Sequence, residues 1–133
     1  MVDKRVDRPV AKFKGKGEQM TFTESMLNFA LKFNELASDQ SEWSQATFGT
    51  DAERGPLGAL RHLEKEAREC QAAVGTNDLA EELADCLLLL LDASRRAGLK
   101  PMTLVEAAQK KMVKNRERVW PSPTSDEPVE HVR

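Results

Sequence analysis

Five consecutive leucines, Leu87–Leu91, restrict the possible folds of this chain more than any other feature of its sequence. They lie in a segment with helical spacing of apolar residues that begins near Asp78 and ends at Gly98, a typical helix terminator. Successive leucines face all sides of a helix, so this helix must be covered on most of its faces. Because four short helices of one chain can hardly provide that cover, the run predicts a homo-oligomer with this helix at its centre.

Helical spacing dominates residues 21–120, and no segment shows the period of two that is typical of strands. Capping boxes, first-turn prolines and glycines predict where the helices begin and end. The starts are Thr21-x-x-Glu24, Pro56, Asp78-x-x-Glu81, and Pro101 with Thr103-x-x-Glu106, and the stops of the second and third helices are Gly75 and Gly98. Phe29 and Phe33 lie on the apolar stripe of the first helix and are expected in the core, and Trp43–Phe48 either continues that helix or forms a short separate one. The predicted class is therefore all-α.

Tails flank the predicted domain of residues 21–120 on both sides. Residues 1–20 hold six basic and three acidic residues without periodicity, which predicts a mobile basic N-terminal arm. Residues 121–133 hold three prolines among mostly polar residues, which predicts an extended C-terminal tail.

Charge and hydropathy exclude several classes of protein. The formal net charge of −2 argues against a dedicated nucleic-acid binder, so no stable nucleic-acid complex is expected. The longest apolar run, Cys86–Leu91, is far shorter than the roughly 18 residues that indicate a membrane span. The N-terminal residues lack the apolar core of a signal peptide, and two cysteines are too few for a disulfide scaffold. A cytoplasmic protein without membrane contact is therefore expected.

Two pairs of acidic residues, each with a spacing of three, are candidates for a metal site. Glu66 and Glu69 lie in the second predicted helix, and Glu82 and Asp85 lie in the third, with 12 residues between the pairs. A spacing of three places both members of a pair on one helix face. Since 12 residues suffice for a tight antiparallel helix hairpin, the two pairs can converge. Four converging carboxylates form an oxygen-rich, negative site that suits Mg²⁺ or Mn²⁺.

The same region also allows other interpretations. Neighbouring charges such as Glu64 and Lys65 indicate that some acids only solvate a helix face. A di-iron centre needs a histidine three residues after a glutamate, and no glutamate of the chain has one. A phosphate-binding loop does not fit, because Gly49 and Gly55 are one position too far apart and Pro56 stands where a lysine is required.

Basic residues gather at the end of the fourth predicted helix. Lys111, Asn115 and Arg118 follow at steps of four and three, and hence lie on one face if the helix continues. Positive charge at a helix C-terminus is favourable by itself, which leaves a purely solvated face as one interpretation. The other interpretation is a clamp for a polyphosphate ester, since such a substrate needs cations opposite a carboxylate–metal cluster.

The ordered set of these motifs resembles the all-α nucleoside triphosphate pyrophosphohydrolases of the MazG type. The set comprises Glu66-x-x-Glu69, Glu82-x-x-Asp85 and Lys111-x-x-x-Asn115-x-x-Arg118. The likeness is closer to the phage-associated branch of dATP/dGTP diphosphohydrolases, which includes the MazZ enzymes, and it extends over residues 41–133. Further matching segments are Trp43-Ser44-x-x-Thr47-Phe48-Gly49, His62, Arg96-Ala97-Gly98, Trp120-Pro121 and Glu130-His131-Val132-Arg133. One departure is Lys65, where many relatives have a further glutamate, and it leaves the number of metal ions open.

The resemblance implies a MazG-like four-helix bundle that assembles as a tetramer, a dimer of dimers, with sites at subunit contacts. It implies hydrolysis of a purine nucleoside triphosphate (dGTP, dATP or GTP) to the monophosphate and pyrophosphate. In this branch the reaction reshapes the nucleotide pool during infection, in the host cytoplasm, and some members supply dGMP for a modified-purine genome.

The resemblance also implies roles for individual residues. The ligands of Mg²⁺ or Mn²⁺ are then Glu66, Glu69, Glu82 and Asp85. Either Glu66 or Glu69 is also the candidate for the catalytic group that takes a proton from the attacking water. The contacts to the nucleotide are Lys111, Asn115 and Arg118 for phosphate or sugar, and Trp43 for the base.

A rival hypothesis is a non-catalytic helical oligomerisation module whose basic tail binds a partner. It predicts no dependence on divalent metal and a loss of function when residues 1–18 are removed, whereas the enzyme hypothesis predicts mostly retained turnover. The role of Asp92 is also open. It lies seven residues after Asp85 on nearly the same helix face, and it either supports the site or pairs with a buried cation.

Overall fold

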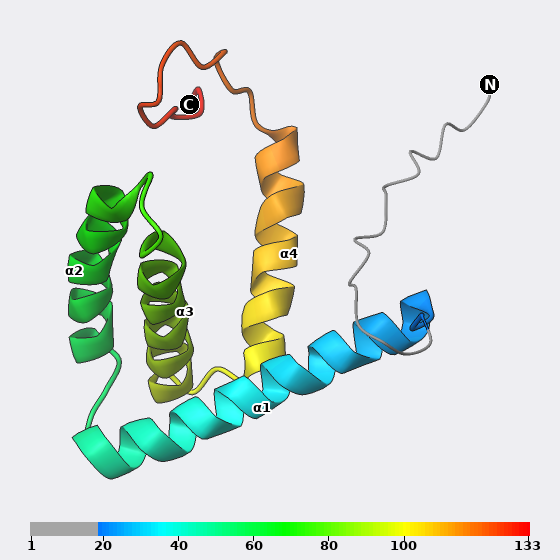
Figure 1. The fold of residues 1–133 in the computed structure, drawn as a ribbon. Coiled ribbons are helices and arrows are strands. Elements are labelled where there is room, and N and C mark those ends of the chain that lie inside the picture. The colour runs from blue at the N-terminus through cyan, green and yellow to red at the C-terminus, as the bar shows by residue number, and fades with distance from the viewer. Residues whose placement is uncertain (1–18) are drawn as a thin grey trace.

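A computed structural model describes residues 19–133, and these residues form four helices (Figure 1). The helices are α1 (Phe22–Phe48), α2 (Leu57–Ala73), α3 (Leu79–Arg96) and α4 (Pro101–Glu117). No strand occurs between residues 19 and 133, which confirms the all-α prediction. The predicted basic arm lies outside the described residues except for positions 19 and 20.

The helix ends follow the expected signals in most places. At Thr21 the side-chain hydroxyl accepts from the Glu24 backbone N–H at 3.2 Å, and the Glu24 carboxylate accepts from the Thr21 N–H at 2.7 Å, so the capping box is confirmed. α1 then continues unbroken to Phe48, which settles the two alternatives for its last turns. Gly75 and Gly98 follow α2 and α3 with φ angles of 84° and 81°, a left-handed conformation that suits glycine.

Two predicted capping signals are wrong. Asp78 precedes α3, but its side chain makes no capping hydrogen bond, because its backbone is already helical (φ −81°, ψ −16°) rather than extended. Thr103 lies inside α4, whose first residue is Pro101 and whose preceding residue is Lys100. The proline therefore marks the start of α4, and the Thr-x-x-Glu pattern does not.

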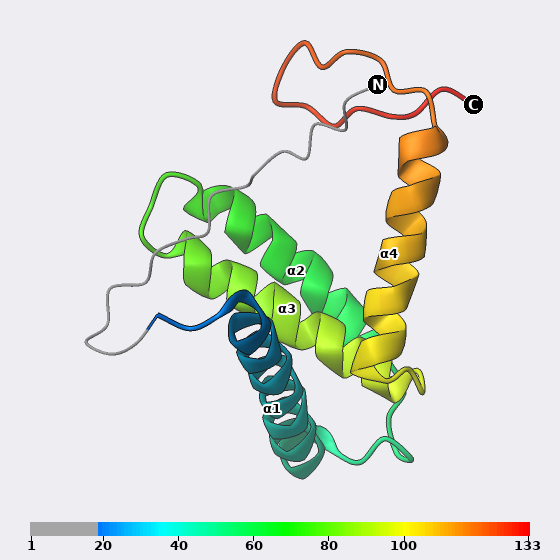
Figure 2. The same ribbon diagram turned by 90° about the vertical axis from the view of Figure 1, so that its right-hand side faces the viewer.

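The helices are arranged around an antiparallel hairpin of α2 and α3, which lie side by side in both views (Figures 1 and 2). α1 crosses the end of this hairpin where α2 begins and α3 ends. α4 starts near the same end and stands apart from α2 and from most of α3. The acidic pairs thus lie on the two adjacent helices α2 and α3, whereas the basic residues lie at the end of α4, outside this hairpin.

The apolar core of the described chain is small. Its buried apolar residues are Cys70, Ala73, Leu91 and Ala93. The other helices cover only one side of α3, so Leu83, Leu87 and Leu90 are exposed. On α1, Phe33 is half-buried and Phe29 is 72% exposed, so the prediction of a core position is wrong for Phe29 within one chain.

Asp92 is the centre of a buried polar network, which we call the Asp92 network. Its carboxylate accepts hydrogen bonds from Ser44 Oγ at 2.6 Å and from Gln40 Nε2 at 3.1 Å. It also pairs with Arg95 Nη2 at 2.6 Å and with Arg96 Nε at 2.9 Å. Burial alone would raise the pKa of Asp92, but these hydrogen bonds lower it to about 2. The open role of Asp92 is thus that of a buried ion-pair partner.

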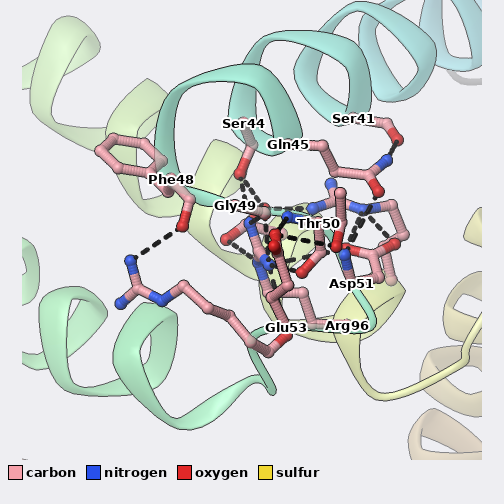
Figure 3. Close-up of polar contacts among 12 residues, drawn as sticks. Ser41, Ser44, Gln45, Phe48, Gly49, Thr50, Asp51, Glu53 and Arg96 are labelled. Atoms are coloured by element: carbon pink, nitrogen blue, oxygen red, sulfur yellow. Dashed lines mark hydrogen bonds and ion pairs between the residues drawn. The ribbon is translucent and has the colours of Figure 1, made fainter.

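The two arginines extend this network to the segment that joins α1 to α2, and Figure 3 shows Arg96 beside this segment. Arg96 donates to the carbonyl oxygens of Gly49, at 3.1 Å, and of Arg54, at 3.3 Å. Arg95 pairs with Asp51, with an Nε–Oδ2 distance of 3.0 Å. The network therefore fixes the end of α3 against the end of α1 and shapes the connection that leads into α2.

The C-terminal residues contain no helix or strand from position 118 onward. They nevertheless turn back on themselves. Val132 N donates to Val119 O at 3.0 Å, and the rings of Trp120 and His131 meet edge to face with centroids 5.7 Å apart. Between residues 19 and 133, no helix combines the length and the hydropathy that crossing a bilayer requires.

Candidate metal and nucleotide site

The α2–α3 hairpin brings three of the four candidate metal ligands together. Carboxylate oxygens of Glu66, Glu69 and Glu82 all lie within 4.8 Å of one another. The Sγ atoms of Cys70 and Cys86, which immediately follow the two acidic pairs, are 3.6 Å apart and show that the pairs face each other. Asp85 is exposed, and its carboxylate is not part of the group. We call Glu66, Glu69 and Glu82 the acid cluster.

Glu66 is the most buried member of the acid cluster, with 6% of its surface exposed. Its Oε1 atom lies 2.7 Å from His62 Nε2, one helical turn earlier on α2. The same oxygen lies 3.5 Å from Lys65 Nζ, and Lys65 also bonds Glu69 Oε1 at 2.7 Å. A buried carboxylate is unfavourable without such partners or a bound cation, so this site is built to hold positive charge.

The pKa shifts of the acid cluster report its crowded negative charge. Partial burial, followed by the charges of Glu69 and Glu66, raises the pKa of Glu82. The hydrogen bond from Lys65 lowers the pKa of Glu69. Three oxygen donors from two rigid helices, with negative charge that one lysine only partly balances, fit a hard divalent cation such as Mg²⁺ or Mn²⁺.

A cavity of about 300 Å³ adjoins the acid cluster through His62, which lines it. Phe48 and Leu89 supply apolar surface, and Arg54 and Arg96 supply charge. This cavity lies where the end of α1, the start of α2 and the middle of α3 meet. Its position beside a candidate metal site makes it the natural place for the organic part of a substrate.

Trp43, the sequence-based candidate for contact with the base, does not line this cavity. It is 57% exposed and packs edge to face on Phe48, with centroids 5.3 Å apart. Sequence reasoning did not single out Phe48 and Arg54 as residues that line this cavity. The sequence did hold a signal for them. Phe48 ends the first helix and Arg54 lies in the glycine-containing connection that follows, where side chains from several helices can meet.

The candidate phosphate contacts lie at the far end of α4. Lys111 is exposed, whereas Asn115 and Arg118 are half-buried. Arg118 Nη1 donates to Asn115 Oδ1 at 3.3 Å, and Trp120 Nε1 donates to the Asn115 carbonyl at 2.7 Å. α4 lies apart from α2 in Figure 1 and diverges from the hairpin toward its C-terminal end in Figure 2, so one chain does not bring these residues beside the acid cluster.

Comparisons with known proteins place this geometry in a family. Residues 36–133 match the family described as dATP/dGTP pyrophosphohydrolase. The Eaa protein of Salmonella phage P22 is 41% identical over 98 residues, which are 74% of this chain but 29% of that protein. The chain therefore spans less than a third of the length of this relative.

A solved structure shares the fold. It is a MazG-like pyrophosphohydrolase of cyanophage S-2L, bound to dGDP and three catalytic Mn²⁺ ions per active site. The TM-score is 0.58 at 26% sequence identity, and the match covers 75% of this chain and 92% of that one. With the family match over 98 of 133 residues, these findings confirm the resemblance seen in the sequence: this chain belongs to the dATP/dGTP pyrophosphohydrolase family of phage MazG-like proteins.

Proposed function

We propose that the protein hydrolyses purine deoxynucleoside triphosphates, dGTP or dATP with GTP as a further candidate, to the monophosphate and pyrophosphate. The observation that carries the proposal is the convergence of Glu66, Glu69 and Glu82 from two helices, in a chain of this family. The dGDP and Mn²⁺ bound by the cyanophage relative support a purine substrate and a divalent cofactor. In an infected cell this activity would reshape the purine nucleotide pool of the host cytoplasm and could supply dGMP for a modified genome.

In this proposal the acid cluster holds Mg²⁺ or Mn²⁺, with Asp85, one turn after Glu82, as a fourth ligand. When bound, such ions polarise phosphoryl oxygens and lower the pKa of a bound water. Either Glu66 or Glu69 takes the proton from the attacking water. His62, bonded to Glu66 Oε1 at 2.7 Å, fixes the orientation of that carboxylate.

The nucleoside is proposed to occupy the cavity beside His62. Phe48 and Leu89 offer apolar surface for a purine ring, and Arg54 offers a donor at the edge. Trp43 then acts indirectly, because its edge contact holds the Phe48 ring in place. Replacing Phe48 with alanine would remove a face of the cavity and raise KM more than it lowers kcat.

Completion of the site requires a second copy of the chain in this proposal. Apolar residues are exposed on all four helices, including Phe29 on α1, Leu57 on α2, Leu87 on α3 and Met112 on α4. Such faces favour association, and a tetramer built as a dimer of dimers would cover them. The separated α4 can then bring Lys111, Asn115 and Arg118 to the acid cluster of a neighbouring copy, where they would neutralise the departing pyrophosphate.

A substrate panel tests the proposed reaction directly. We expect release of pyrophosphate and monophosphate from at least one purine triphosphate with Mg²⁺ or Mn²⁺, and loss of that activity in EDTA. The measurement is chromatographic separation of products from all common ribo- and deoxyribonucleoside triphosphates. Inactivity on the whole panel with either metal contradicts the proposal and favours a helical interaction module.

Mixing two inactive variants tests whether sites are shared between copies. Glu66→Gln removes a proposed metal ligand from the acid cluster, and Arg118→Ala removes a proposed phosphate contact at the end of α4. If a site combines the acid cluster of one copy with α4 of its neighbour, random reassembly restores about a quarter of the sites. Half of the dimers then contain one copy of each variant, and one of the two sites in each mixed dimer is intact. The readout is pyrophosphate release after the variants are unfolded and refolded together.

The control mixture combines Glu66→Gln with Glu82→Gln, whose defects fall in the same cluster of one chain and cannot complement. Recovery in the first mixture alone supports shared sites. No recovery in either mixture means that each chain forms its own site.

A further inference from the structure

Lys65 already occupies the acid cluster with a positive charge. Its Nζ atom lies 2.7 Å from Glu69 Oε1 and 3.5 Å from Glu66 Oε1, so one ammonium group bridges two of the three carboxylates. The Lys65 side chain is 63% exposed, which leaves it free to turn into solvent.

The ammonium and a divalent ion would compete for the same oxygens. The group of candidate ligand atoms includes Glu66 and Glu69, the two residues that Lys65 contacts. Two cations within a few ångströms repel each other, and the divalent ion carries the larger charge. A divalent ion that enters the cluster therefore has to displace the Lys65 ammonium group, or it binds more weakly because that group repels it.

Other cations near the cluster do not share this position. Arg68 pairs with Glu64 on an exposed part of α2, and no contact joins it to the acid cluster. His62 contacts Glu66 alone among the three acids. Lys65 is thus the residue of α2 that contacts two members of the cluster with a positive charge.

We propose that Lys65 is a built-in counter-ion of the acid cluster, which balances the carboxylates of the metal-free protein and weakens divalent-ion binding until it is displaced. This inference rests on the proposed metal site. In this role Lys65 sets the affinity of the cluster for the ion, whereas the carboxylates of the cluster bind the ion directly.

The test is a titration of the full chain with Mn²⁺ in the absence of nucleotide, followed by electron paramagnetic resonance of the free ion. Lys65→Met, which keeps the length of the side chain but not its charge, is expected to bind Mn²⁺ about tenfold more tightly than the wild type. Lys65→Arg keeps the charge and is expected to stay within about twofold of the wild type. The matched control Arg68→Met removes a charge from the same helix and is expected to leave affinity unchanged.

Thermal unfolding gives a second readout without turnover. Metal-free Lys65→Met should melt at a lower temperature than the wild type, and saturating Mn²⁺ should raise its midpoint by more than it raises that of the wild type. The inference is overturned if Lys65→Met binds Mn²⁺ no more tightly than the wild type does. It is also overturned if Arg68→Met increases the affinity for Mn²⁺ as much as Lys65→Met does. If no variant binds Mn²⁺, the proposed metal site fails together with it.

Discussion

Replacing Glu66 with glutamine is expected to lower kcat/KM for the best purine triphosphate by at least about a thousandfold, because metal ions contribute several kcal/mol to phosphoryl transfer. The substitution keeps the size of the side chain and the hydrogen bond with His62. It removes the negative charge of the most buried carboxylate in the acid cluster, which is 6% exposed. The measurement is steady-state pyrophosphate release with saturating Mn²⁺.

The matched control is Glu64→Gln, which removes a carboxylate from the same helix two residues earlier. Glu64 is exposed and pairs with Arg68, so activity should stay within about twofold of the wild type. Circular dichroism should show unchanged helix content in both variants. Full activity of Glu66→Gln would contradict a catalytic role for the acid cluster.

Replacing Asp92 with asparagine is expected to lower the free energy of unfolding by about 3–5 kcal/mol, the typical cost of breaking a buried ion pair from one side. The reason is the Arg96 side chain, which is 3% exposed and would keep its charge without the Asp92 carboxylate. Ser44 and Gln40 would also lose a charged acceptor. We expect the thermal midpoint to fall by more than about 10 °C in a scan of metal-free protein.

Glu81→Gln serves as the control, since it removes an exposed acid from the first turn of the same helix. Its midpoint should change by no more than a few degrees. If Asp92→Asn melted like the wild type, the Asp92 network would not hold the end of α1 against α3, and the cavity beside His62 would lose its explanation.

Local signals in the sequence were sufficient for the helices and for most of the acid cluster. The Thr21 capping box, Pro56 and Pro101 and the two glycines mark ends that depend only on neighbouring residues. The convergence of Glu66, Glu69 and Glu82 was also predictable from their spacing and the hairpin length. The same argument was wrong for Asp85, because the exact rotation of α3 against α2, which spacing does not fix, leaves that side chain exposed.

Features that depend on distant contacts were not predictable in the same way. The partners of Asp92 include Ser44, which is 48 positions away and whose hydroxyl has no distinguishing pattern. Phe48 lines the cavity and Trp43 does not, and this difference depends on how α1 crosses the hairpin. The direction of α4 depends on its contacts with α3, which no local pattern marks.

The thin apolar core has a consequence for how the protein behaves on dilution. Leu83, Leu87 and Leu90 of α3 are uncovered in a single chain, so in the proposed assembly part of the hydrophobic free energy would become available only when copies meet. Stability would then rise with protein concentration, and an early, low level of synthesis would give chains that are both less stable and incomplete at their sites. Expression level would in this way set the onset of activity without any separate regulator.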